Sequence, residues 1–239
     1  MDGQAVKQII DLASERMTLE MPDGTYARGS FHRIFPEVSH PKDIVMTTLA
    51  SFVDLITTNP QGFDLTGAVV TINDEFEVDL LSPPRADGTR DHYASSSSPI
   101  RPFAFGQWYG LNSFNIALLS LFVQDEKLLG LFRLMQEIKV EDGATITDNG
   151  TSLSVTVKHG VSAASAAQEQ IPSIVRLKPY RYFAEADQVE VPLLLRLRQD
   201  DNAVQACLME CDGGAWKVAA YQVITNKLKE LGCQLPIYC

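Results

Sequence analysis

The chain has 239 residues, of which 45% are hydrophobic and 21% charged, so it can bury a sizeable core and is not disordered. Its formal net charge of −10 disfavours general nucleic-acid binding, because an acidic surface repels a phosphate backbone. A membrane-spanning helix needs about 18 consecutive apolar residues, and the sequence contains no apolar run of that length. The start MDGQAVKQII has neither the basic nor the apolar block of a secretory signal, so we expect a cytoplasmic protein with no membrane partner.

The first forty residues predict a small appendage. Apolar residues recur at helical spacing between Val6 and Ala13, which indicates a short helix. Alternating residues from Met17 to Met21 and the turn that begins at Pro22 then predict a hairpin. We accordingly expect an N-terminal helix and hairpin appendage, residues 1–40, and a core domain, residues 41–239.

Residues 49–56 place apolar side chains on one helical face and predict a helix. Thr47 or Thr48 is expected to cap its start. The sequence Asn59-Pro60-Gln61-Gly62 is expected to end it, because proline cannot continue a helix and glycine tolerates a positive φ.

A hairpin and a long irregular stretch follow. Apolar and polar residues alternate in Ala68–Ile72 and Phe76–Leu80, on either side of a turn, which predicts two paired strands. The next stretch, Ser82–Ile100, is rich in proline, glycine and serine. Its length predicts a mobile surface loop or a hinge.

Aromatic residues gather in the segment Arg101–Val123. Phenylalanines flank Trp108 on both sides, and aromatic side chains bury large areas, so we expect Trp108 to be largely buried. Asn112 or Ser113 is expected to cap a helix that follows. A second helix with apolar residues between 128 and 135 should pack against the first.

The second half of the chain is mainly strand-like. A hairpin is predicted around Asp148-Asn149-Gly150, and residues 162–170 predict a helix or a flexible crossing. Val189–Arg198 and Ala203–Glu210 have the pattern of long strands, and a last amphipathic helix is predicted between residues 218 and 231. The series predicts an α+β fold, an antiparallel sheet with packed helices, in a single domain with the small N-terminal appendage.

The order of these features resembles a known family. The helix TLASFVDLI, a strand hairpin, the turn FGQWYGLNSF before a helix, a further hairpin and the strand LLLRLR occur in a recognisable series. From about Thr47 to Leu231 the chain resembles the phage and prophage proteins of unknown function typified by YfdQ. The resemblance implies a phage-derived protein and supplies no catalytic residues. Met1–Ser39 has no counterpart in it.

The sequence holds none of the motifs that announce common enzyme classes. It has no phosphate-binding glycine loop, no dinucleotide fingerprint, no His-Glu-x-x-His pair and no Gly-x-Ser-x-Gly elbow. Asp87, Asp91 and His92 lie near Ser95–Ser98 and supply the residue types of a hydrolase triad, but a solvated loop is polar in any case. We therefore expect no catalytic residues, no cofactor and no enzyme activity.

Two groups of residues invite a metal site, and both have a simpler interpretation. Glu75, Glu77 and Asp79 share one strand face, which we expect to be the solvent side of a hairpin. The four cysteines all lie near the C-terminal end: Cys207, Cys211, Cys233 and Cys239. Their spacing lacks the Cys-x2-Cys hooks of closed zinc sites, so we expect reduced thiols and no bound metal.

Basic residues form the strongest chemical signal. Arg196 and Arg198 lie two apart on one predicted strand and should project from the same face, with Leu195 and Leu197 directed inward. Arg forks bind phosphate and carboxylate, so such a face is a candidate anion site or docking surface.

A second basic segment adds to this face if it is extended and paired with the first. Arg176 and Lys178 then project together, and Arg181 follows. The candidate anion-binding residues are therefore Arg176, Lys178, Arg196 and Arg198. The alternative is that these cations form cross-strand pairs with nearby acidic residues at positions 185, 187 and 190.

We expect a non-enzymatic phage-type accessory protein that acts through self-association and binding, because long strands such as Val189–Arg198 offer edges for intermolecular pairing. A second hypothesis is a counter-defence protein whose basic strand face holds a nucleotide-like anion or a host protein. A third is an enzyme of unfamiliar type with Ser82–Ile100 as a lid. The expected partners are thus further copies in a homo-oligomer, a host protein or a small anionic ligand, in the host cytoplasm.

Overall fold

The computed structural model describes residues 18–21, 24–27, 33–34, 43–138, 146–148, 152–158, 166–200 and 203–239. The chain divides into two compact units. The smaller contains Met1–Lys42 with Pro84–Asp91, and the larger contains Asp43–Pro83 with His92–Cys239. Pro84–Asp91 thus belongs to the smaller unit although it lies far from the N-terminal segment in the sequence.

In the smaller unit, β1 (Thr18–Met21) and β2 (Gly24–Ala27) form the predicted antiparallel hairpin, and β3 (Arg33–Ile34) pairs with β2. The alternation of apolar and polar residues in these two segments explains the pairing. The helix predicted between Val6 and Ala13 lies outside the described residues.

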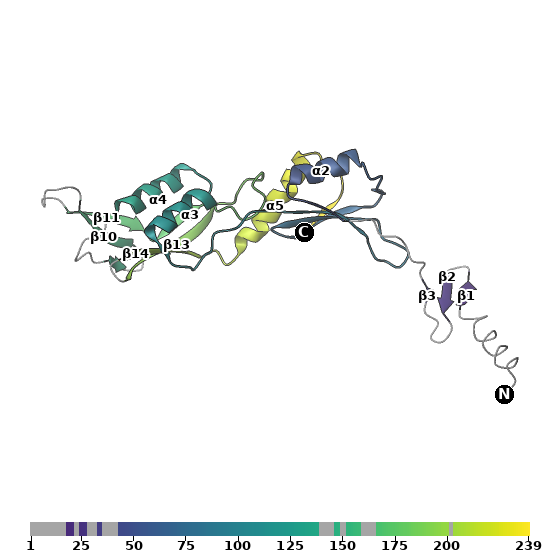
Figure 1. Ribbon diagram of the computed structural model, residues 1–239, viewed down its shortest axis with the longest axis horizontal. Helices are drawn as coiled ribbons and strands as arrows, with labels where there is room; N and C mark the ends of the chain where they lie inside the picture. Colours follow the sequence, from purple (N-terminus) through teal and green to yellow (C-terminus); the bar gives the residue numbers. More distant parts are fainter. Residues whose placement is uncertain are drawn as a thin grey trace, which may run out of the picture. The chain divides into compact units, whose positions relative to one another are not determined.

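The larger unit has an α+β fold, as the sequence predicts. Its described helices are α2 (Leu49–Thr58), α3 (Leu111–Leu121), α4 (Glu126–Glu137) and α5 (Ala215–Glu230). Figure 1 shows α3 and α4 side by side next to β13 and β14, and α2 beside α5. None of the described helices is long and apolar enough to cross a membrane.

One sheet of the larger unit is antiparallel throughout. Its order is β12 (Ile174–Leu177), β13 (Val191–Asp200), β14 (Ala203–Glu210) and β8 (Tyr109–Gly110). The strand predicted over Val189–Arg198 is therefore central and has a partner on each side. This strand is therefore not the edge strand that the prediction required: β14 pairs with it along Leu193–Asp200 on one side, and β12 pairs with it along Val191–Leu194 on the other.

A second sheet has five strands, with order β15 (Ile237–Tyr238), β5 (Val69–Asp74), β6 (Glu77–Leu81), β7 (His92–Ser97) and β4 (Ile44–Met46). The hairpin β5–β6 is the predicted one, whereas β15 joins β5 and β4 joins β7 in parallel. A further hairpin around residue 149 is also confirmed. It pairs β9 (Ile146–Asp148) with β10 (Ser152–Lys158), and β11 (Ala166–Pro172) adds to it as a strand, not as the expected helix or crossing.

Helix ends show how local chemistry sets the elements. Thr48 caps α2 by accepting the N–H of Ser51 at 3.2 Å, and Asn59 ends it in the left-handed region with φ 41°. The predicted cap at Asn112 or Ser113 is wrong, because α3 already begins at Leu111 after Gly110.

Burial corrects three expectations. The second half of Ser82–Ile100 is not a mobile loop but strand β7, whose small serines pack between β6 and β4; Ser96 is fully buried and donates to the carbonyl of Thr48 at 3.0 Å. Glu75 is buried in the turn between β5 and β6, and Asp79 is buried on β6, so these carboxylates do not form the expected solvent face of the hairpin. Trp108 is only partly buried, although it was expected to be largely buried, whereas Trp216 is buried in the core.

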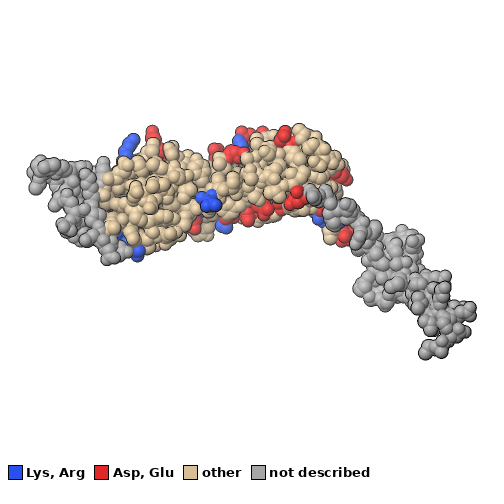
Figure 2. Space-filling model, in the orientation of Figure 1, with Lys and Arg blue, Asp and Glu red and all other residues tan. Residues whose placement is uncertain are grey.

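The core of the larger unit is one continuous apolar cluster that includes both sheets and all four described helices. Its largest fully buried side chains include Phe52, Phe114, Phe122, Tyr182 and Phe183. Acidic side chains gather over the part formed by α2, α5 and the five-stranded sheet, whereas few charges cover α3 and α4 in the view of Figure 2.

Candidate functional site

The predicted basic strand face is oriented as expected. Arg196 and Arg198 lie on the outer face of β13, and Leu195 and Leu197 are buried on the other face. Arg198 Nε donates to Gln205 Oε1 at 2.9 Å, and its guanidinium carbon lies 4.4 Å from the centroid of the Trp108 ring. The side chain of Arg198 is therefore held against its own sheet.

The strand register does not bring the four candidate basic residues together. Arg176 faces Pro192 across the β12–β13 pair, four residues from Arg196 along β13. At about 3.3 Å per residue this is roughly 13 Å. Lys178 follows the end of β12, and its carbonyl accepts the N–H of Val123 at 2.9 Å. The structure thus does not gather these four residues around one point.

The residue types of a hydrolase triad are not assembled either. His92 Nε2 contacts Asp79 Oδ2 at 3.0 Å, and its Nδ1 contacts Asp43 Oδ1 at 3.1 Å. Asp91 pairs with Arg85, and Asp87 accepts from Thr89. No serine of the described segments bonds to His92, so the arrangement lacks a nucleophile beside a base.

The cysteines are four free thiols. Cys207 and Cys233 are buried, and burial raises the pKa of both thiols, whereas Cys211 and Cys239 are exposed. Within the described ranges, no three His, Cys, Asp or Glu side chains come together as a metal site.

A different feature of the fold stands out, namely the outer edge of β12. This strand is the first in the order of its sheet, and no described strand pairs with its other side. The N–H of Leu195 donates to the carbonyl of Ser173 at 2.7 Å. In an antiparallel pair every second residue faces its partner strand, so the main-chain groups of Ser173, Val175 and Leu177 face β13. Alternate residues turn the other way, so the N–H and C=O groups of Ile174 and Arg176 face outward.

Pro192 agrees with this assignment. It stands opposite Arg176, has no N–H to give, and its carbonyl accepts from the Cys211 thiol at 3.1 Å on the far side of β13. After the end of β12, main-chain groups at the end of α3 occupy the edge, since the N–H of Tyr180 donates to the carbonyl of Leu121 at 2.9 Å. The open part of the edge is therefore short and centred on Ile174 and Arg176.

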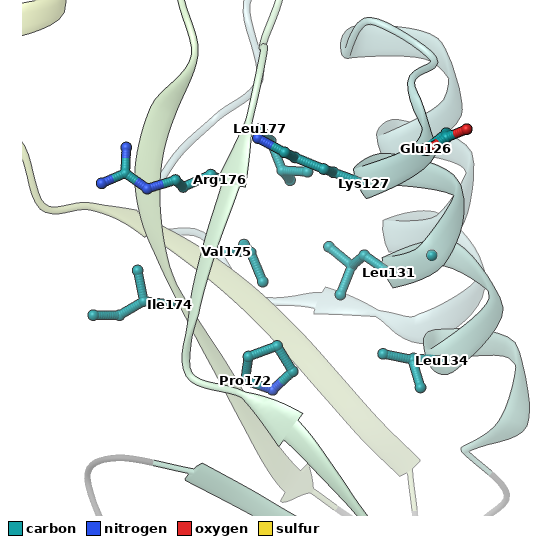
Figure 3. A pocket seen from close by; sticks show the side chains of 10 residues that line it. Glu126, Lys127, Leu131, Leu134, Pro172, Ile174, Val175, Arg176 and Leu177 are labelled. Atoms are coloured by element: carbon teal, nitrogen blue, oxygen red, sulfur yellow. The ribbon is translucent and has the colours of Figure 1, made fainter.

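The open edge borders a groove between β12 and α4, of about 330 Å³, lined by residues 126–134 and 172–177. We call it the β12–α4 groove. Figure 3 shows Val175 directed toward Leu131 of α4, while Ile174 and Arg176 project to the opposite side of the strand. Ile174 and Arg176 therefore line the groove with their main-chain atoms, and their side chains point away from it.

The groove is apolar, and its charged lining residues are Glu126, Lys127 and Arg176. Its floor includes Leu131, Leu134 and Val175, and a Cβ added at Gly130 would meet no heavy atom within 4 Å. Lys127 at one end is paired with Glu190. Arg176 is exposed and has no ion pair with any residue whose side chain is described.

Sequence reasoning missed this site because it sought edges in the longest strands. The sequence offered only a short strand pattern at Ile174–Leu177, and this segment comes to lie beside helix α4 only in the folded chain. Comparisons with known protein families, with curated proteins and with solved structures find no match to this chain.

Proposed function

We propose that this protein is a non-enzymatic binding protein that takes up an extended segment of a partner protein in the β12–α4 groove, as an added strand. The observation that carries the proposal is the pair of residues Ile174 and Arg176, whose main-chain groups face the groove without a described strand partner. Strand addition supplies partners for these groups, and side chains of the added strand supply the specificity.

The groove defines the chemistry of the segment. Side chains of an added strand alternate between the two faces of the sheet. On the face of Val175, they enter the apolar space beside Gly130 and Leu134, so aliphatic residues fit there. On the other face, they stand beside Ile174, which is 60% exposed, and Arg176. An acidic residue beside Arg176 gains an opposite-charge cross-strand pair.

A partner protein suits the groove better than a second copy of this chain. Two copies each carry a formal net charge of −10 and repel one another over their mean surfaces. The open edge is also short, since the main chain at Tyr180 is already bonded to Leu121. A flexible segment needs little edge, whereas two folded copies must bring larger surfaces into register.

The first test uses a panel of capped octapeptides, with valine or leucine at alternate positions and glutamate, glutamine or lysine between them. Binding is measured by two-dimensional ¹H–¹⁵N spectra of the full chain. We expect the amide signals of Ile174, Arg176 and Gly130 to shift together on addition of glutamate peptides. A panel in which no peptide shifts these three signals contradicts the proposal.

Two matched pairs of variants locate the contact. Arg176→Pro removes the outward N–H, while Arg176→Gln removes only the charge; both leave the bonds to β13 intact, because those come from neighbouring residues. We expect Arg176→Pro to bind much more weakly than Arg176→Gln. Gly130→Trp should fill the groove and abolish binding, and Gly130→Ala should retain it.

Self-association is the competing outcome. Light scattering that shows a dimer at micromolar concentration in the parent and a monomer in Arg176→Pro would assign the open edge to a second copy of the chain. A parent that stays monomeric, together with peptide binding at the same amides, supports the hetero-partner.

A further inference from the structure

A second feature, apart from the β12–α4 groove, is a buried arginine held between two aromatic rings. Arg181 lies in the segment after β12, and only 4% of its side chain is exposed. Its guanidinium carbon lies 4.4 Å from the centroid of the Phe105 ring and 4.2 Å from that of the Trp216 ring. Its Nη1 forms an ion pair with Glu210.

The other side of this guanidinium is formed by Nε and Nη2. Among the described residues, neither Nε nor Nη2 of Arg181 has a hydrogen bond, and both atoms are buried. Buried N–H groups are normally hydrogen-bonded, so two such groups on one side chain indicate a missing acceptor. These two N–H groups form the side-on fork of an arginine, which binds a planar pair of acceptors.

The fork belongs to a pocket of about 170 Å³ with aromatic walls, Phe76, Phe103, Phe105 and Trp216. Two carboxylates complete it. Glu75 is 9% exposed and accepts from Lys217 Nζ at 2.8 Å through Oε1, which leaves its Oε2 as an acceptor; Glu210 stands at the opening with 42% of its side chain exposed.

The charges around Arg181 exclude a second anion. Glu210 already pairs with Arg181 and Glu75 with Lys217, and Asp212 adds a further negative charge nearby. A phosphate or carboxylate would meet three carboxylates for two cations. The pocket therefore suits an uncharged, planar ring that presents two adjacent acceptors to Arg181 and an N–H donor to a carboxylate.

We propose that this pocket binds the base of an uncharged 6-oxopurine nucleoside. The O6 and N7 atoms of guanine form the acceptor pair that arginine recognises side-on. Its N1–H and N2–H groups are donors that suit a carboxylate lining the pocket, such as Glu75. Trp216 and the phenylalanines offer the faces on which a base stacks.

The test measures the fluorescence of Trp216 during titration with guanosine. The chain has two tryptophans, so the variant Trp108→Phe leaves Trp216 as the only one. We expect a saturable change with guanosine, and binding at least about tenfold weaker for 7-deazaguanosine, which has a C–H in place of N7, and for adenosine, which places a donor at position 6. These analogues leave the protein unchanged, so folding does not enter the comparison.

Two protein variants complete the test. Arg181→Lys, compared by circular dichroism with its parent, should lose the guanosine response. Arg198→Lys is the control, since Arg198 also stacks on a tryptophan but its Nε already bonds to Gln205. The proposal is overturned by the absence of a saturable response up to millimolar guanosine, or by equal affinity for guanosine and 7-deazaguanosine.

Discussion

The imidazole of His92 is bonded to the carboxylate of Asp79, with 3.0 Å between Nε2 and Oδ2. The second ring nitrogen, Nδ1, lies 3.1 Å from Asp43, so both nitrogens face carboxylates. Only the doubly protonated ring donates to both at once. Burial disfavours that charged form, but the hydrogen bonds to Asp79 and Asp43 prevail and raise the pKa of His92 above its usual 6.5.

This contact predicts that stability falls as the pH rises. A histidine whose pKa is higher in the folded chain stabilises the fold fully below its unfolded value of 6.5. The contribution is lost as the pH rises through the folded-state pKa of His92. Denaturant midpoints measured across neutral pH should therefore drop for the parent more than for His92→Gln. Parallel pH profiles of the two proteins would show that this contact does not stabilise the fold.

Gly130 in the middle of α4 predicts a stabilising substitution. Glycine lowers helix stability by about 0.5–1 kcal/mol relative to alanine. A Cβ at Gly130 meets no heavy atom within 4 Å, so Gly130→Ala should raise the free energy of unfolding by about that amount. Urea denaturation measures it. A loss of stability would mean that the space beside α4 is filled.

Asn59 predicts a graded pair of variants at the end of α2. Its φ of 41° is left-handed, its Oδ1 accepts the N–H of Phe63 at 2.8 Å and its Nδ2 donates to the Phe63 carbonyl at 2.9 Å. Asn59→Ala loses both bonds and strains the backbone, so it should cost about 2–4 kcal/mol. Asn59→Gly loses the bonds without the strain and should cost less in the same thermal or chemical melts. Equal losses would contradict the role given to the backbone.

The two tryptophans predict opposite responses to truncation. Trp216 is 8% exposed within the core cluster, and Trp216→Ala should cost about 3–5 kcal/mol, the range for emptying a large aromatic site. Trp108 is only partly buried and stacks on Arg198, so Trp108→Ala should cost clearly less. Melting temperatures of the two variants decide this, and a larger drop for Trp108→Ala would reverse the assignment.

Much of the secondary structure follows from local sequence. The start of α2 at Thr47 or Thr48, its end at Asn59-Pro60-Gln61-Gly62 and the pairing of β5 with β6 were predicted, because caps, helix-ending residues and alternating runs act over a few residues. The inward direction of Leu195 and Leu197 follows from the same alternation. The phage-family resemblance, self-association and the cytoplasmic location stay predictions.

The sites were decided by tertiary structure. The alternation that orients Arg196 carries no information on how far Arg176 lies from it, because register is set by long-range pairing. Likewise Arg181 looks like one more surface cation in the sequence. Its burial arises because a loop residue, Phe105, and a residue of the last helix, Trp216, converge on it from distant parts of the chain. The sequence by itself determined strongly patterned elements such as α2 and the β5–β6 hairpin, since those depend on near neighbours, but it did not predict the strands β7 and β11. The fold alone decided which strand has an open edge and which charge is enclosed, since both depend on what the remaining chain covers.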